Sequence, residues 1–207
     1  MTPDDQPVLS GSFIQLEPLA VDHVHQLLVA ANEDRTTYHW TQVPETVAGM
    51  RTYVNGLLSD AKVGTVMPFV QRRQVDQRVV GCTRYLEIKR WSGAQFPDEV
   101  EIGGTWLARS AQRTAANSEA KLLLLTHAFE TWNVQRVAIC TDARNVQSRS
   151  AIERLGATLE GILRHHRASV APGEAGIARD TAAYSILPDE WPAIKTRLRA
   201  QLYGDDL

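Results

Sequence analysis

The chain has 207 residues and a formal net charge of −2, and 43% of its residues are hydrophobic and 22% are charged. This length and composition are typical of a globular protein with one substantial core, and they exclude a disordered chain. Because the charge is near neutral and no basic stripe is interleaved with aromatic residues, nucleic-acid binding is not expected. The longest apolar run, Leu122–Leu125, is far too short to span a bilayer, so no membrane partner is expected.

The N-terminal segment Met1–Ser10 is polar and contains two prolines. It lacks the basic start and apolar core of a signal peptide, so we predict a disordered tail at 1–10 and a single domain at 11–204. Cys82 and Cys140 stand alone within apolar segments, which indicates neither a disulfide framework nor a metal site. Isolated thiols suit a reducing compartment, and the expected location is the cytoplasm.

The first half of the chain alternates between strand and helix patterns. Residues 11–19 alternate apolar and polar side chains, which predicts a half-buried strand. Asp22 is the expected N-cap of a first helix, and Gly64 is the expected end of a second helix that follows Pro44. Two strands at 65–75 and 78–91, joined as a hairpin at Asp76–Gln77, and a loop at 91–98 are expected next.

The second half continues this alternation. The expected strands lie at 99–107, 136–141, 157–168 and 179–187, and the expected helices carry apolar stripes within 122–132, 145–155 and 191–202. His127 falls off the stripe of its helix, which predicts a surface position. The pair Gly103–Gly104 indicates a bulge in its strand. Strands that alternate with helices indicate an α/β (α+β) protein with a mixed sheet covered by helices.

The strand–loop–helix unit around Gln112–Asn117 has the features of an anion site. Backbone N–H groups at a helix start have no helical partners, and the macrodipole makes that end positive. A pyrophosphate can therefore bind there without a dedicated side chain. Arg113 adds a positive charge, and Thr114 and Asn117 add short hydrogen-bonding groups.

Two motifs together resemble the GNAT acetyltransferases. The order Glu-Ile-Gly, Trp-Leu and Gln-Arg-Thr-Ala-Ala-Asn before an apolar helix is similar to their acyl-CoA pyrophosphate region, although Ala115 and Asn117 stand where that family has Gly, and Gly or Ala. The segment from Asn145 and Ser148 to Gly156 resembles the family's second motif. Ile152 stands where many members have a tyrosine, which points to the RimJ/RimL-like branch.

The resemblance implies a fold and an activity. The implied GNAT fold has a mixed, mostly antiparallel sheet of about seven strands flanked by helices and splayed at the fourth strand. The implied activity is transfer of an acetyl or related acyl group from acyl-CoA to a primary amine, by direct attack in a ternary complex and without a metal. The acceptor is a protein N-terminus, a lysine or a small molecule, and a homodimer is a further expectation. The residues expected to contact acetyl-CoA are Trp106, Leu107, Gln112, Arg113, Thr114, Ala115, Ala116, Asn117, Asn145 and Ser148.

The catalytic assignments each have a structural alternative. The resemblance makes Glu101 the candidate base, because it lies 11 residues before Gln112, the spacing at which related acetyltransferases carry a catalytic glutamate, and it makes Ser148 the candidate acid for the leaving thiolate. Glu101 equally suits an ion pair with an arginine on a neighbouring strand. Ser148 suits a capping role, and Asn145 is by itself a good N-cap.

The acceptor site is expected to involve Tyr38, His39, Trp40, Gly104 and His165. The aromatic cluster at 38–40 suits either acceptor binding or closure of the core edge. Gly104 either widens the acceptor channel or only accommodates a bulge. His165 and its neighbour face opposite sides of their strand, so one of them is a candidate for the acceptor site.

Two other functions remain open. A non-catalytic acyl-CoA sensor or partner-binding module would bind CoA without turnover. A binder of ATP or a dinucleotide would share only the helix-terminus geometry, and neither G-x-G-x-x-G nor a Walker lysine is present in the sequence.

Overall fold

The computed structural model describes residues 6–204, which form an eight-stranded mixed sheet covered by helices. The strands follow the order β1-β2-β3-β4-β5-β6-β8-β7, and neighbours are antiparallel except for β5 and β6. Their bounds are β1 (Leu9–Ser10), β2 (Ile14–Pro18), β3 (Val66–Arg73), β4 (Val79–Lys89), β5 (Glu99–Leu107), β6 (Arg136–Asp142), β7 (Thr158–Ala168) and β8 (Ala178–Ile186). The helices are α1 (Val24–Ala31), α2 (Val47–Lys62), α3 (Ala115–Thr126), α4 (Val146–Leu155) and α5 (Trp191–Tyr203). The predicted fold class is confirmed.

The additional strand comes from the segment predicted as a tail. Leu9–Ser10 pairs with β2, and the Glu119 carboxylate accepts hydrogen bonds from the N–H groups of Ser12, Phe13 and Ile14 just beyond it. The predicted disorder is therefore wrong for the part of the tail near Ser10, while residues 1–5 lie outside the described residues. With β1 counted, the splayed strand is the fifth rather than the fourth.

The helices begin and end at residues with a local reason to be there. The Thr46 side chain caps α2 by accepting from the Gly49 N–H, and Gly156 ends α4 with a left-handed φ of 100°. The prediction of Asp22 as an N-cap is wrong. A 3₁₀ turn at Val21–His23 precedes α1, so Asp22 lies inside that turn.

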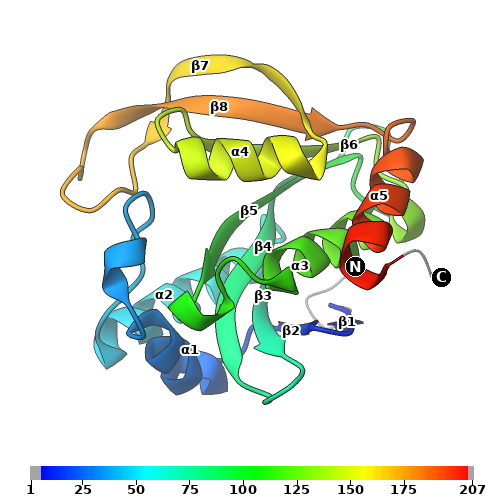
Figure 1. Ribbon diagram of the computed structural model, residues 1–207. Coiled ribbons are helices and arrows are strands. Elements are labelled where there is room, and N and C mark those ends of the chain that lie inside the picture. The colour runs from blue at the N-terminus through cyan, green and yellow to red at the C-terminus, as the bar shows by residue number, and fades with distance from the viewer. Residues whose placement is uncertain (1–5, 205–207) are drawn as a thin grey trace.

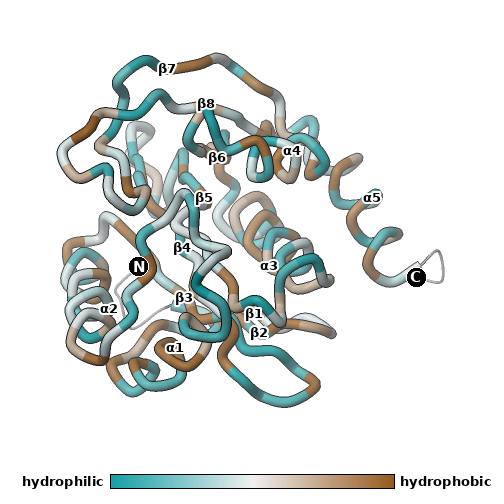
Figure 2. The backbone as a smooth tube through the Cα atoms, turned by 60° about the vertical axis from the view of Figure 1, so that its left-hand side comes forward, coloured by the Kyte–Doolittle hydropathy of each residue, from teal (hydrophilic) through white to brown (hydrophobic). Residues whose placement is uncertain are grey.

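The sheet splits between β5 and β6, and this opening is the splay of the fold. The two strands pair only from Glu99 to Glu101 on β5, whereas β5 runs on to Leu107 and β6 to Asp142. Figure 1 shows the result: β6, β7, β8 and α4 form an upper part, and β2–β5 with α1, α2 and α3 form a lower part. In the turned view of Figure 2 the same two parts separate beyond the paired ends of β5 and β6. The backbone groups along the rest of β5 are thereby left without a strand partner on that side.

One core cluster joins the strands to the helices, with Tyr85 and Leu124 among its fully buried members. The prediction that His127 lies at the surface is wrong, because its side chain is buried between Tyr85 and Trp132. After Thr126 the helix widens into a π-helical turn at His127–Thr131, which changes the face that each residue presents. Among the described residues, no helix has the length and apolar character needed to cross a membrane.

Candidate functional site

The turn between β5 and α3 presents unpaired backbone donors. Thr114 caps α3: its hydroxyl accepts from the Ala116 N–H at 3.2 Å and donates to the Ala111 carbonyl at 2.7 Å. Within residues 6–204, the N–H groups of Arg113, Thr114 and Ala115 have no hydrogen-bond acceptor. Together with the positive end of the α3 macrodipole, these donors form a site for an anion.

The backbone of this turn does not need the glycine that the family motif has at position 115. Ala115 is already helical, and the left-handed residue is Arg113, with a φ of 59°. The turn therefore does not need glycine at 115. Asn117 lies in the first turn of α3, and its Oδ1 atom is buried without a hydrogen-bond partner in the described part of the chain. A buried acceptor beside unpaired donors is the polar lining that a ligand with amides and phosphates requires.

Gln112 connects this turn to the end of β5 and to Thr37. Its Nε2 donates to the Leu107 carbonyl at 2.9 Å and to the Thr37 hydroxyl at 3.0 Å. The Tyr38 hydroxyl donates to the same carbonyl at 3.2 Å. The end of β5 is thus fixed by side chains from the loop that follows it and from the α1–α2 connection.

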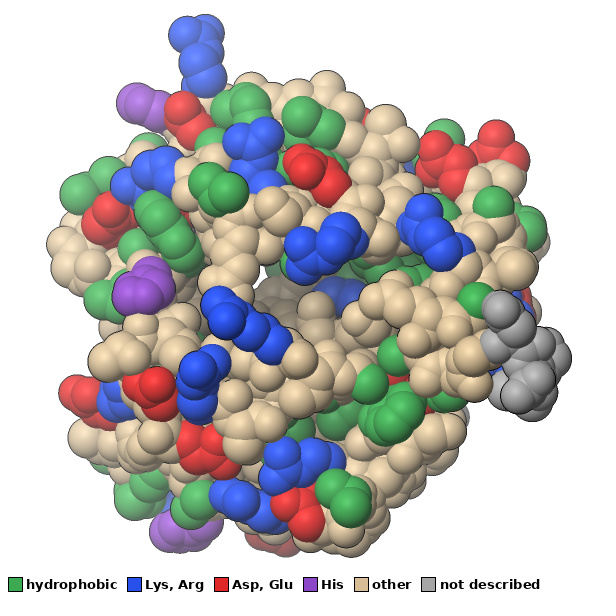
Figure 3. Space-filling model, viewed as in Figure 1, with side chains coloured by type: hydrophobic (Ala, Val, Ile, Leu, Met, Phe, Trp, Pro, Cys, Tyr) green, Lys and Arg blue, Asp and Glu red, His purple; other side chains and the backbone are tan. Residues whose placement is uncertain are grey.

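The start of α4 lies on the other side of the splay. The Asn145 side chain accepts from the Ser148 N–H at 3.0 Å, so the structure shows its capping role. The Ser148 hydroxyl makes no hydrogen bond within the described residues, and Ser148 is half-buried. Figure 3 shows a hollow in the middle of this face, between the upper and lower parts, with Lys and Arg side chains at its edge.

Glu101 is held in an ion pair at the point where the strands separate. Its side chain is 6% exposed, and its two oxygens accept from Arg167 on β7 at 2.7 and 3.0 Å. The bond to Glu101 raises the pKa of Arg167. Burial, and then the charge of Glu101, raise the pKa of the Cys140 thiol to about 12, so this thiol stays protonated and inert.

Gly104 forms a bulge in β5. The β4–β5 register shifts between Cys82 and Arg84, and Gly104 adopts a left-handed φ of 56°. A Cβ at this position would overlap the guanidinium of Arg84, which fills the adjacent space. The structure therefore shows the predicted bulge at Gly104, and a side chain occupies the room that a wider channel would need.

A cavity of about 810 Å³ lies beside the end of β5. Its walls come from the α1–α2 connection, α2 and the β7–β8 loop, and include Arg35, Tyr38, Val43, Pro44, Tyr53 and Pro172. Two of its lining residues contact the splayed strand: the Tyr53 hydroxyl accepts from Trp106 Nε1 at 3.3 Å, and the Tyr38 hydroxyl donates to the Leu107 carbonyl. Of the predicted acceptor residues, Tyr38 lines this cavity, whereas the exposed His39 and His165 are not among the described residues that line it.

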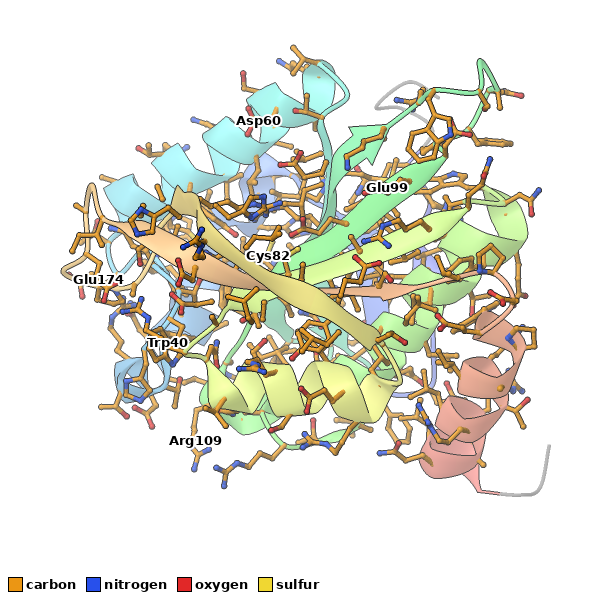
Figure 4. All side chains as sticks on the ribbon, turned by 90° about the horizontal axis from the view of Figure 1, so that it is seen from above. Trp40, Asp60, Cys82, Glu99, Arg109 and Glu174 are labelled. Carbon is orange, nitrogen blue, oxygen red and sulfur yellow. The ribbon has the colours of Figure 1, made fainter. Side chains whose placement is uncertain are left out.

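Arg144 connects three segments at one end of the molecule, among them the segment that carries Trp40. The Arg144 guanidinium lies 4.7 Å above the Trp40 ring and also bonds Glu174 in the β7–β8 loop and Asp142 at the end of β6. Figure 4 shows Trp40 and Glu174 at the same end of the molecule. Sequence reasoning missed Arg144, because its partners come from segments far apart in the chain.

The sequence of this chain matches a known protein family. Residues 14–158 match the family described as an acetyltransferase (GNAT) domain. The chain belongs to the GNAT acetyltransferase family. This confirms the recognition made from the two motifs, and the GNAT relatives described next support its RimJ/RimL-like branch.

Three GNAT relatives illustrate the similarity. A GCN5-related N-acetyltransferase from Brucella melitensis superimposes with a TM-score of 0.83 at 27% identity, covering 98% of this chain and 88% of that one. RimJ from Mycobacterium smegmatis, solved with CoA-disulfide, shares the fold with a TM-score of 0.78 at 19% identity over 97% of both chains. YdaF of Bacillus subtilis, a proposed ribosomal N-acetyltransferase, is 34% identical over 101 residues, 49% of this chain. That match spans about half of YdaF, 52% of its length.

Proposed function

We propose that this GNAT protein transfers an acetyl or related acyl group from acyl-CoA to a primary amine, with both substrates bound together. The observation that carries the proposal is the set of N–H groups at 113–115, which have no acceptor in the described part of the chain and lie beyond the end of β5, where β5 and β6 have separated. RimJ, which shares this fold, was solved with a CoA derivative. We also place the protein in the cytoplasm, where its two free cysteines would stay reduced.

The residues around the splay suit both the pyrophosphate and the pantetheine arm of acyl-CoA. The pyrophosphate would bind the N–H groups of Arg113, Thr114 and Ala115, with the Arg113 side chain adding charge. The buried Asn117 Oδ1 offers an acceptor to an amide of the pantetheine arm. That arm would follow β5 at Trp106–Leu107, with Asn145 and Ser148 opposite, and Gln112 and Ala116 would support the turn.

The chemistry needs a deprotonated amine and a stabilised leaving group. The amine nitrogen bonds the thioester carbon, the C–S bond breaks with its electron pair on sulfur, and the amine loses one proton. The free Ser148 hydroxyl can donate a hydrogen bond to that sulfur. Glu101 remains the candidate base, acting through water, although its two bonds to Arg167 support the structural role equally well.

The acceptor is proposed to enter from the cavity lined by Tyr38 and Tyr53, because both tyrosines are hydrogen-bonded to the end of β5. His39, Trp40, Gly104 and His165 stay predictions for the acceptor path. The likeness to YdaF, a proposed ribosomal N-acetyltransferase, makes a protein amine the first class of acceptor to test. The net charge of −2 argues against capture of a strongly basic substrate by charge alone.

The test is release of CoA thiol from acetyl-CoA with a panel of peptide N-termini, lysine peptides and small amines. We expect acceptor-dependent release by the wild type and a loss of about a hundredfold in Ser148→Ala, with Ser150→Ala on the same helix as the matched control. A similar loss in Glu101→Gln would identify Glu101 as the base, whereas a lower melting temperature with full turnover would identify a structural pair.

The second candidate function is a non-catalytic acyl-CoA sensor. The ion pair between Arg167 and Glu101 favours it, because it occupies the carboxylate that would act as the base. It predicts acetyl-CoA binding in calorimetry without thiol release for any acceptor. Absence of acetyl-CoA binding by the wild type would refute both functions.

A further inference from the structure

Two cationic side chains approach the β5 bulge from opposite faces of the sheet. The Lys121 side chain on α3 is buried, and its Nζ donates to the Thr105 hydroxyl at 3.0 Å. The Arg84 guanidinium lies against the backbone of Gly104 and donates to the Tyr53 hydroxyl on α2 at 3.3 Å.

The alternation of side chains along β4 establishes that the faces are opposite. The Tyr85 hydroxyl donates to the Leu124 carbonyl of α3, so Tyr85 points toward α3. Thr83 shares that face, and its hydroxyl lies 2.8 Å from that of Thr105. Arg84, between these two residues, therefore points toward α2.

Neither cation has a carboxylate partner. Across residues 6–204, no acidic oxygen lies within ion-pair distance of Lys121 or Arg84. A buried charge without a counter-charge costs several kcal/mol even after the protein relaxes around it. Burial lowers the pKa of Lys121 to about 8, so the side chain is still mostly charged at neutral pH. Among the described residues, the buried charge of Lys121 and the half-buried charge of Arg84 therefore lie at the bulge without a counter-charge.

The bulge lies where the reacting thioester is expected. Gly104 and Thr105 are beyond the last β5 residue that pairs with β6, so they belong to the open part of the splay. The rise of a helix places Lys121 about 9 Å along α3 from its first residue, Ala115, so the phosphate site is a separate one.

We propose that Lys121 and Arg84 form an electrostatic clamp on the two sides of the bulge that stabilises the negative charge developing on the thioester oxygen. The proposal rests on the proposed acyl transfer. As the amine nitrogen bonds the carbonyl carbon, the C=O π electrons move to the oxygen; when the C–S bond breaks, they return and sulfur leaves with its electron pair. Both cations keep their protons throughout, and the proton lost by the amine goes to water.

The clamp acts in the transition state more than in substrate binding. Removing one donor to an oxyanion costs roughly a hundredfold or more in turnover. We therefore expect Lys121→Met and Arg84→Met each to lower the turnover of acetyl-CoA with hydroxylamine by about that factor, with a calorimetric Kd for acetyl-CoA within about threefold of the wild type. Lys121→Arg keeps the charge and should recover most of the turnover. The exposed Lys62, changed to Met, is the control.

An infrared measurement adds a readout that a purely structural role would not change. With acetyl-CoA labelled with ¹³C at the carbonyl, the positive field should polarise the bond, so the bound carbonyl band should move to higher wavenumber in Lys121→Met than in the wild type. Equal bands and equal turnover in all variants would overturn the clamp while leaving acyl transfer intact. An equal loss of binding and turnover in the variants would also overturn the clamp. A wild-type preference for succinyl-CoA over acetyl-CoA that Lys121→Met abolishes would overturn it as well. A wild type that does not bind acetyl-CoA would refute the proposed function itself.

Discussion

Replacing Lys121 by methionine should stabilise the protein, and the gain should depend on pH. The lysine is 9% exposed, its Nζ donates to the Thr105 hydroxyl, and burial lowers its pKa from 10.5 to about 8. Since one pKa unit corresponds to about 1.4 kcal/mol, the buried ammonium costs about 3 kcal/mol of folding free energy at pH 7. Methionine has a similar length and no charge, so Lys121→Met should recover much of that cost.

The sign of the pH dependence follows from proton binding. Below pH 8 both the folded and the unfolded chain carry the proton, and the cost is present in full. Between pH 8 and 10.5 the unfolded chain binds more protons than the folded one, so wild-type stability contributed by this group rises with pH. The advantage of Lys121→Met should therefore shrink by about 3 kcal/mol across that window.

Urea unfolding of both proteins at pH 7, 8, 9 and 10 measures this difference, and the comparison cancels the titration of the tyrosines that the two proteins share. A difference that stays constant from pH 7 to 10 would show that the ammonium is solvated in solution, and it would refute the reasoning. A wild type that is the more stable protein at pH 7 would do the same.

Three further changes test the packing around the site. Gly104→Ala should lower the free energy of unfolding by about 2 kcal/mol or more in urea titrations, since it adds a clash to a left-handed φ, whereas Gly64→Ala, with open space around it, should cost only about 1 kcal/mol. Arg144→Ala should leave the urea midpoint of unfolding almost unchanged but speed proteolytic cleavage in the loop 170–177, because the loop loses its bond from Arg144 to Glu174, and unchanged cleavage would contradict this reasoning. Glu119→Ala should cost about 3 kcal/mol, because three backbone N–H groups lose their acceptor, and a loss under 1 kcal/mol in the same titration would show that water replaces it.

The sequence predicted the architecture because its signals are local. Alternation in 14–18 and the stripe of α2 arise from neighbouring residues, and the GNAT motifs cover the turn from β5 into α3. The buried position of His127 could not be read in this way. A single π-helical turn shifts the helical phase, and nothing in the local composition of 127–131 distinguishes it from an α-helix.

The missed site residues depend on contacts between distant segments. The sequence predicted Glu101 and its pairing with an arginine, but it could not identify Arg167, which is 66 positions away on β7, at the edge of the sheet. Lys121 had a local signal, since a lysine directly precedes the apolar run Leu122–Leu125 and lies within a buried stretch of helix. The sequence alone could not show that its side chain points inward to Thr105.

The exceptions to ordinary protein geometry at the end of β5 support one interpretation of this region. Left-handed backbone at Gln77 or Asn133 accompanies a turn between elements, which explains it locally. Around the splay, Gly104 and Arg113 have left-handed φ, and within residues 6–204 Lys121 is a buried cation without a counter-charge and the N–H groups of 113–115 lack acceptors. Each of these features reduces stability, and they lie between Gly104 and Lys121, in β5, the turn after it and α3, while Glu87 in β4 and His165 in β7 also have left-handed φ. Unfavourable features that are concentrated at one place are retained where a ligand offsets their cost. Bound acyl-CoA should therefore raise the melting temperature of the protein. The rise should be larger for the wild type than for Lys121→Met only if the clamp already acts in the ground state. Equal increases would place its contribution in the transition state, as the proposed clamp requires.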